Sequence, residues 1–233
     1  YMVSGFDPHG ARDAVFVPVG INYDRVIEDR IQTAAIATPE GEKPRFKFSP
    51  RILVKFLAHN VALKFHRHWY RYGYACVSFG LPISLRAYMS ERNLDFRTMD
   101  AEHRFAAIAG LGEHLIEKVG AVIPVLPVSL VTTALLHGGD HKMSLLEIKT
   151  EVARLIAELK ARGAHAHIPR ADLDYAIEVG LRMLRLRHLV KEEDGLFSVN
   201  PDEVTLLRSY ANSIAHLLSP AAIERPTVIA ASE

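Results

Sequence analysis

Helical segments dominate the second half of the sequence and constrain its fold more than any other feature. We predict helices over residues 99–119, 128–137, 143–162, 170–188 and 202–218. Between the last two, residues 189–199 alternate around Asp194-Gly195, which is a hairpin signal. We therefore expect residues 123–233 to form a mainly helical C-terminal region.

An uncharged run lies at the start of this region. Residues 119–136 are 18 in number, which is near the lower limit for crossing a bilayer. Pro124 and Pro127 interrupt a helix there, because proline lacks the N–H group and clashes with the preceding turn. We expect an extended segment and then a buried helix rather than a membrane span.

Two short apolar runs in the first half predict β-strands. Residues 15–21 form a near-continuous apolar run, typical of a strand buried on both faces, although Pro18 indicates an edge or a bulge. Residues 74–79 form the second run, and residues 80–82 are expected to turn the chain away. Because 49% of the residues are hydrophobic, the chain can build a core. We expect an α/β fold whose first domain is residues 1–122.

Polar side chains follow the first predicted strand directly, in the order Asn22, Tyr23, Asp24 and Arg25. Open α/β sheets bind ligands beyond the carboxyl ends of their strands. The planar guanidinium of Arg25 suits a phosphate group there. A local ion pair between Arg25 and Asp24 is the alternative interpretation, since structural ion pairs are common.

Positive charge is concentrated in one stretch. Residues 43–90 contain nine Lys and Arg and no Asp or Glu, together with the single Trp and nine of the 18 Phe and Tyr. A helix over residues 51–69, begun by Ser49-Pro50, is amphipathic. Such a surface suits phosphate, an anionic membrane or nucleic acid. The alternative is a helix that packs on the sheet and turns a solvated basic face outward.

Other chemistries find little support. The single cysteine, Cys76, excludes an internal disulfide and is expected in the core. The 12 histidines offer no three or four ligands at a recognised metal-binding spacing, so we predict no metal site. A phosphate-cradling glycine-rich loop and a complete catalytic set are not apparent, and we predict no cofactor.

Two segments resemble conserved blocks of one enzyme family. Residues 17–28, Val-Pro-Val-Gly-Ile-Asn-Tyr-Asp-Arg-Val-Ile-Glu, resemble the third block of the glycerol-3-phosphate acyltransferases of bacteria and mitochondria. Residues 72–85, Tyr-Gly-Tyr-Ala-Cys-Val-Ser-Phe-Gly-Leu-Pro-Ile-Ser-Leu, resemble the fourth. Residues 127–136 are similar to the region after the catalytic domain. The resemblance implies that residues 1–122 are the C-terminal part of an acyltransferase α/β domain.

The resemblance implies an activity, its partners and a location. The family transfers a fatty acyl group from acyl carrier protein (acyl-ACP) or acyl-coenzyme A (acyl-CoA) to the sn-1 hydroxyl of glycerol 3-phosphate, the first step of phospholipid synthesis. It would act without a cofactor, peripherally on the cytoplasmic face of the inner membrane. The basic segment would then contact the anionic membrane surface or an acidic carrier protein.

The resemblance also implies roles for individual residues. Arg25 would bind the substrate phosphate, and Asn22 and Tyr23 would shape the polar end of the glycerol-phosphate pocket. The remaining substrate-binding candidates would set the strand path or the adjacent turn, and they are Pro18, Gly20, Phe79, Gly80 and Pro82.

The catalytic residues of the family are expected outside this chain. A His-x4-Asp block supplies the general base and its partner, and a Gly-x-Arg-Ser block helps to bind the phosphate. Both precede the third block, where this chain has only His9, four positions before Asp13. We expect them upstream of Tyr1, and we expect the 233 residues alone to be inactive.

A non-enzymatic function is the competing interpretation. Two helices followed by a helix and a hairpin resemble a winged helix, a common nucleic-acid-binding module. Residues 140–218 carry 11 Lys and Arg against 12 Asp and Glu, which argues against a nucleic-acid partner. A scaffold or interaction module and a catalytically degenerate homologue stay open.

Overall fold

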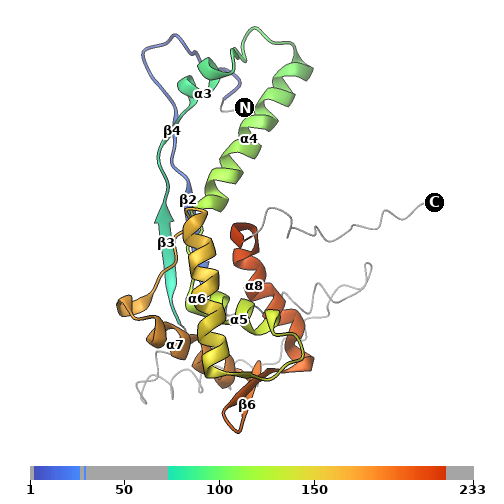
Figure 1. Cartoon of the computed structure of the whole chain (residues 1–233). Coiled ribbons are helices and arrows are strands. Elements are labelled where there is room, and N and C mark those ends of the chain that lie inside the picture. Colours follow the sequence, from blue (N-terminus) through green and yellow to red (C-terminus); the bar gives the residue numbers. More distant parts are fainter. Residues whose placement is uncertain (1–2, 27–28, 30–72, 219–233) are drawn as a thin grey trace, which may run out of the picture.

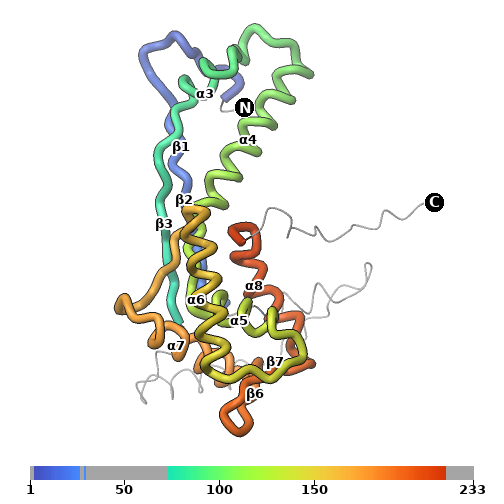
Figure 2. The backbone as a smooth tube through the Cα atoms, in the orientation of Figure 1, coloured from blue at the N-terminus to red at the C-terminus, as the bar shows by residue number. Residues whose placement is uncertain are grey.

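The computed structural model describes residues 3–26, 29 and 73–218. Within them, a long β-ribbon and one long helix lead away from a compact group of helices (Figures 1 and 2). The mixture of helices and small sheets agrees with an α/β class in the broad sense. The predicted amphipathic helix over 51–69 lies outside the described residues.

The β-ribbon is built from four short strands that pair antiparallel. Strand β1 (Val15–Phe16) pairs with β4 (Ile83–Ser84), and β2 (Val19–Tyr23) pairs with β3 (Ala75–Phe79).

The register of the ribbon changes by one residue at its middle. Val17 and Pro18 lie opposite the three residues 80–82, which makes a β-bulge. The bulge predicted from Pro18 is therefore confirmed. The turn predicted at residues 80–82 is wrong, because the chain continues along the ribbon.

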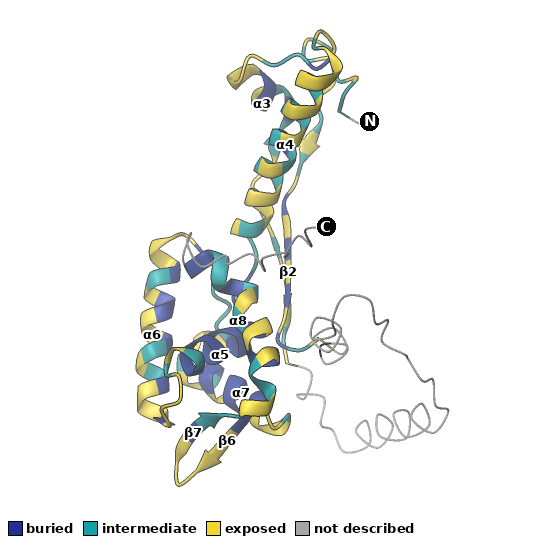
Figure 3. Ribbon diagram, turned by 90° about the vertical axis from the view of Figure 1, so that its right-hand side faces the viewer, coloured by how far each residue is buried: buried dark blue, intermediate teal, exposed yellow. Residues whose placement is uncertain are grey.

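Exposure alternates along the ribbon, as Figure 3 shows. Gly20 and Asn22 are buried on the inner face, whereas Val19, Ile21 and Tyr23 are exposed on the outer face. The prediction that residues 15–21 are buried on both faces is therefore wrong for the described chain. Its apolar run supplies one covered face and one exposed apolar face, because a two-stranded ribbon packs on its neighbours through one side only.

The far end of the ribbon is closed by helices α3 (Leu85–Glu91) and α4 (Ala101–Ala121). Asp13 organises this end: its carboxylate accepts hydrogen bonds from the Ser84 hydroxyl at 2.5 Å and from the Arg86 backbone N–H at 3.1 Å. A small separate core fills the space beneath, and its buried members are Leu85, Tyr88, Met89, Phe96 and Leu111.

The compact group contains the other helices, α5 (Pro127–His137), α6 (Leu145–Ala161), α7 (Leu173–Leu186) and α8 (Val204–Leu218). Together with α4, they confirm the five predicted helices to within three residues at each end. Ser144 and Glu147 form a capping box at the start of α6, and Asp172 caps α7 by accepting from the Tyr175 N–H at 3.0 Å. Residues 119–136 divide into the end of α4, an extended segment and a helix, as predicted.

A three-stranded antiparallel sheet borders this group. Strand β5 (Met143–Ser144) pairs with β7 (Leu196–Val199), which pairs with β6 (Val190–Glu193), so the spatial order is β5-β7-β6. Asp194 and Gly195 join β6 to β7 with positive φ angles of 53° and 77°. This is the backbone of the tight hairpin that the Asp-Gly pair predicts, and the hairpin prediction is confirmed.

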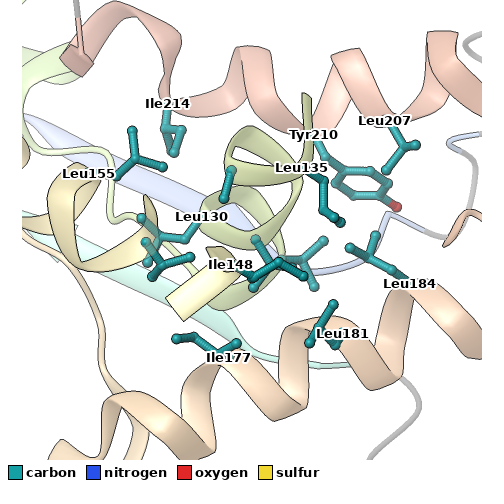
Figure 4. Close-up of a cluster of buried hydrophobic side chains, with 14 of the residues drawn as sticks. Leu130, Leu135, Ile148, Leu155, Ile177, Leu181, Leu184, Leu207, Tyr210 and Ile214 are labelled. Atoms are coloured by element: carbon teal, nitrogen blue, oxygen red, sulfur yellow. The ribbon is translucent and has the colours of Figure 1, made fainter. Parts of the chain in front are cut away.

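Helix α5 is the central element of the compact group, and α6, α7 and α8 pack around it (Figure 4). Nine of its 11 residues are buried. Gly180 lets α7 approach closely, because a Cβ atom there would lie 2.7 Å from the Val131 Cγ2 atom and 2.9 Å from the Pro127 carbonyl oxygen. The core residues labelled in Figure 4 are Leu130, Leu135, Ile148, Leu155, Ile177, Leu181, Leu184, Leu207, Tyr210 and Ile214.

Among helices in 3–26, 29 and 73–218, none combines the length and the apolar composition needed to cross a bilayer.

Candidate functional site

The polar end of β2 is attached to the start of the compact helical group. Asn22 is buried, and its Nδ2 group donates a hydrogen bond of 2.9 Å to the carbonyl oxygen of Pro124. Its Oδ1 atom accepts from the Tyr23 backbone N–H at 2.8 Å. Both polar ends of the Asn22 side chain are thus engaged, so this candidate positions the strand end from within the protein.

Asp24 joins three elements that are distant in the sequence. Its Oδ1 atom accepts from the Val128 N–H at 2.9 Å, in the first turn of α5. Its Oδ2 atom accepts from the Tyr74 N–H at 2.9 Å, and its own N–H donates to the Tyr74 carbonyl at 2.8 Å. The N-cap residue of α5, Leu126, has no side-chain group to offer, so Asp24 supplies the capping acceptor instead.

The Asp24 carboxyl group has a pKa above its ordinary value. It is 1% exposed, and burial raises its pKa to about 6, although the hydrogen bonds from Val128 and Tyr74 act in the opposite direction. Burial also raises the pKa of the nearby Cys76 thiol, and Asp24 adds to that rise. Cys76 is half-buried and has the properties of a packing residue rather than of an activated nucleophile.

Three other candidates meet at the bulge, where the ribbon touches the end of α4. The Gly80 N–H donates to the Pro18 carbonyl at 2.8 Å. A Cβ atom on Gly20 would overlap the backbone of Val122, and one on Gly80 would lie 3.0 Å from the Val122 Cγ1 atom. The third and fourth blocks thus use their glycines to bring the ribbon close to the residue that ends α4.

The structure sorts the predicted site residues into two groups. Those in the first face the helical group or the bulge contact, and they are Pro18, Gly20, Asn22 and Gly80. Those in the second are exposed on the outer side, and they are Tyr23, Phe79 and Pro82, with Phe79 72% exposed. Arg25 is half-buried just beyond the end of β2. Their common pocket stays a prediction.

Sequence reasoning missed a group of side chains at the polar end of β3. The ring of Tyr74 contacts the ring of His167, with centroids 5.3 Å apart. The guanidinium of Arg170 lies 4.2 Å from the ring centroid of Tyr175. Tyr74 is more than 90 residues from the other three in the sequence, so the sequence does not show that they meet.

One local signal in this group was overlooked. His167 and Asp172 have the His-x4-Asp spacing. They follow the fourth block, however, whereas the family's catalytic pair precedes the third. Asp172 caps α7, and a Gly-x-Arg-Ser block does not follow the pair. The spacing alone therefore does not identify a catalytic dyad.

A groove of about 710 Å³ opens near the other end of β2, between the ends of α4, α6 and α8. Its lining is mostly apolar. The His216 ring is hydrogen-bonded to the Gly120 carbonyl at 3.0 Å, and the Arg162 guanidinium binds Glu158 at 2.9 Å. Because these polar groups are already engaged, they offer few donors to a phosphate group in the groove.

Comparison with known proteins agrees with the geometry in linking the two halves of the chain. The family model for the glycerol-3-phosphate acyltransferase C-terminal region matches residues 62–225. A glycerol-3-phosphate acyltransferase of Pseudomonas putida is 26% identical over 219 residues, which cover 88% of this chain and 24% of that protein. One from Aeromonas hydrophila is 24% identical over 100% of this chain and 28% of its own length. The protein of this name from Xylella fastidiosa is 22% identical over 91% of this chain and 24% of its own length.

This chain thus spans about a quarter of the length of the curated relatives it matches. The family match covers well over half of the chain, and it begins within the basic stretch of residues 43–90 and continues past the end of α8. The chain therefore belongs to the glycerol-3-phosphate acyltransferase family and carries its C-terminal region.

Proposed function

We propose that this chain is part of an enzyme that transfers a fatty acyl group from acyl-ACP or acyl-CoA to the sn-1 hydroxyl of glycerol 3-phosphate. The observation that carries the proposal is the attachment of the third block to the C-terminal region through Asn22 and Asp24. The Aeromonas hydrophila relative is similar over 100% of this chain, on both sides of the attachment, which supports treating them as one functional unit.

Within that unit, the chain contributes substrate binding rather than proton transfer. Arg25 binds the phosphate of glycerol 3-phosphate through its fork of N–H donors. Asn22 and Asp24 fix the backbone on either side of Tyr23, and so fix the backbone position from which the Arg25 side chain extends. The general-base histidine and its aspartate come from a segment that this chain does not include.

The outer face of the ribbon supports a further packed segment. Val19, Ile21, Tyr23, Val77 and Phe79 are exposed there, and the register makes them neighbours on one side of the two strands. A contiguous exposed apolar surface marks an interaction site. The segment that carries the general base packs on this face in the proposed enzyme.

The organisation of the chain forms part of the same proposal. Residues 1–122 belong to the acyltransferase α/β domain, and residues 123–233 form a winged-helix-like region. The two separate buried clusters support this boundary. The order α5-β5-α6-α7-β6-β7 and the sheet order β5-β7-β6 support the winged-helix assignment.

Peripheral binding to the cytoplasmic face of the inner membrane completes the proposal. The basic and aromatic composition of residues 43–90 supports it, because lysine and arginine attract anionic headgroups and aromatic rings favour the interface.

The 233-residue chain alone is expected to transfer no acyl group. The measurement is lysophosphatidate formation from glycerol 3-phosphate with either palmitoyl-CoA or palmitoyl-ACP. The control is the protein encoded by the open reading frame that contains this chain. This protein is expected to form lysophosphatidate. Clear turnover by the 233 residues would place the general base within them, and an inactive control would contradict the assigned reaction.

A further inference from the structure

The missed group at the polar end of β3 has the chemistry of an anion site. Three of its members lie in or beside the loop that leads into α7, and they are His167, Arg170 and Tyr175. The fourth, Tyr74, contacts His167 through its ring and Tyr175 through its hydroxyl group. Figure 2 shows this loop beside the end of β3 that Tyr74 precedes. The group thus gathers a guanidinium, an imidazole and two phenols.

The loop is held firmly in its position. The Val125 N–H donates to the His165 carbonyl at 3.0 Å, and the His167 N–H donates to the Val125 carbonyl at 2.9 Å. Arg170 and Ala171 both have left-handed backbones, with φ angles of 59° and 54°. Such a conformation is unfavourable for a residue with a Cβ atom. Two in succession, one of them the arginine of the group, indicate a functional constraint on this loop.

The charge on Arg170 is available to a ligand. Within the described part of the chain, its guanidinium stacks on Tyr175 and has no ion pair with a carboxylate. The two acidic residues that follow it are engaged elsewhere: Asp172 caps α7, and Asp174 binds the Lys149 ammonium at 2.9 Å. Burial and the neighbouring Tyr175 hydroxyl raise the pKa of Tyr74.

The group also adjoins the third block. Tyr74 is bonded through its backbone N–H and carbonyl to Asp24, the residue before Arg25. The two carboxylate oxygens of Asp24 accept from the backbone N–H groups of Tyr74 and Val128.

We propose that Tyr74, His167, Arg170 and Tyr175 form a phosphate-monoester binding site, contributed mainly by the C-terminal region. The arginine provides two parallel N–H donors to the phosphate oxygens, and the tyrosine hydroxyls and imidazole bind the remaining oxygens. The inference rests on the proposed function in one respect: the monoester is glycerol 3-phosphate.

The test is calorimetric titration of the 233-residue chain with inorganic phosphate and with glycerol 3-phosphate. We expect the Arg170→Gln variant to bind both ligands at least about tenfold more weakly than the original chain. The control is Arg92→Gln, because Arg92 also stacks on a tyrosine ring, at 4.0 Å from the centroid of Tyr88, but at the far end of the ribbon. Vesicles with and without phosphatidate test a lipid headgroup as the source of the phosphate.

The outcomes separate this inference from the proposed role of Arg25. The site would be overturned if Arg170→Gln and the original chain bind phosphate and glycerol 3-phosphate with equal affinity, or if the original chain binds neither ligand. Weaker phosphate binding in Arg170→Gln, with unchanged binding in Arg25→Gln, would support the site and contradict phosphate binding by Arg25. Loss of phosphate binding only in Arg25→Gln would contradict the site and support phosphate binding by Arg25. Binding to phosphatidate vesicles but not to glycerol 3-phosphate would keep the phosphate site and assign it to lipid.

Discussion

Replacing Arg187 by methionine is expected to lower the free energy of unfolding by about 3–5 kcal/mol. Arg187 and Asp29 form a buried ion pair with an N–O distance of 2.6 Å, and their side chains are 12% and 8% exposed. The Tyr210 hydroxyl donates to Asp29 and accepts from Arg187. Removing the guanidinium takes a close positive charge away from a buried carboxylate, which is the costly case for an ion pair.

A second substitution separates charge from packing. The double variant Arg187→Met with Asp29→Asn keeps a side chain that can accept from Tyr210 but removes the buried charge. It is expected to recover more than half of the lost stability in urea unfolding followed by circular dichroism. If the double variant is no more stable than Arg187→Met, the loss comes from packing around the aliphatic part of the arginine.

The contribution of Asp24 to the stability of the chain is expected to fall by about 2 kcal/mol between pH 4 and pH 7. Its ordinary pKa is 3.8, and burial raises that value to about 6 in the folded chain. The folded state therefore binds more protons than the unfolded state in this range. Stability from the protonated carboxyl is present below pH 4 and is lost as the pH rises through 6.

The Asp24→Asn variant isolates this contribution because its side chain does not titrate. The difference in unfolding free energy between the original chain and Asp24→Asn should decrease as the pH rises. Other carboxyl groups cancel in that difference, including Glu151, whose pKa is lowered to about 2 by its hydrogen bond to Arg154. Carbon-13 NMR of the Asp24 carboxyl gives the pKa directly, and a value below 4 would contradict the prediction.

The helices and the hairpin could be predicted because local patterns determine them. Asp194 and Gly195 are adjacent residues that tolerate positive φ, so they specify a hairpin without help from the rest of the chain. Pro18 marked the bulge for a similar reason, since proline cannot donate a ladder hydrogen bond.

The attachments that build the candidate site could not be predicted, because they join distant residues. Asp24 caps a helix that begins more than 100 residues later, and Asn22 binds a carbonyl 102 residues away. Composition suggested a buried strand at residues 15–21, yet an apolar run does not reveal which of its faces a neighbour covers. The sequence placed Arg25 after a strand but could not show that Tyr74 and Arg170 lie at the same end of the ribbon.

Steady-state kinetics of the enzyme encoded by the open reading frame that contains this chain test the central claim most directly. The Arg25→Gln variant is compared with the original enzyme and with the Arg92→Gln control. We predict that the KM for glycerol 3-phosphate rises at least about tenfold in Arg25→Gln, while the KM for the acyl donor is unchanged. An unchanged KM for glycerol 3-phosphate would contradict the account and make Arg25 a structural residue.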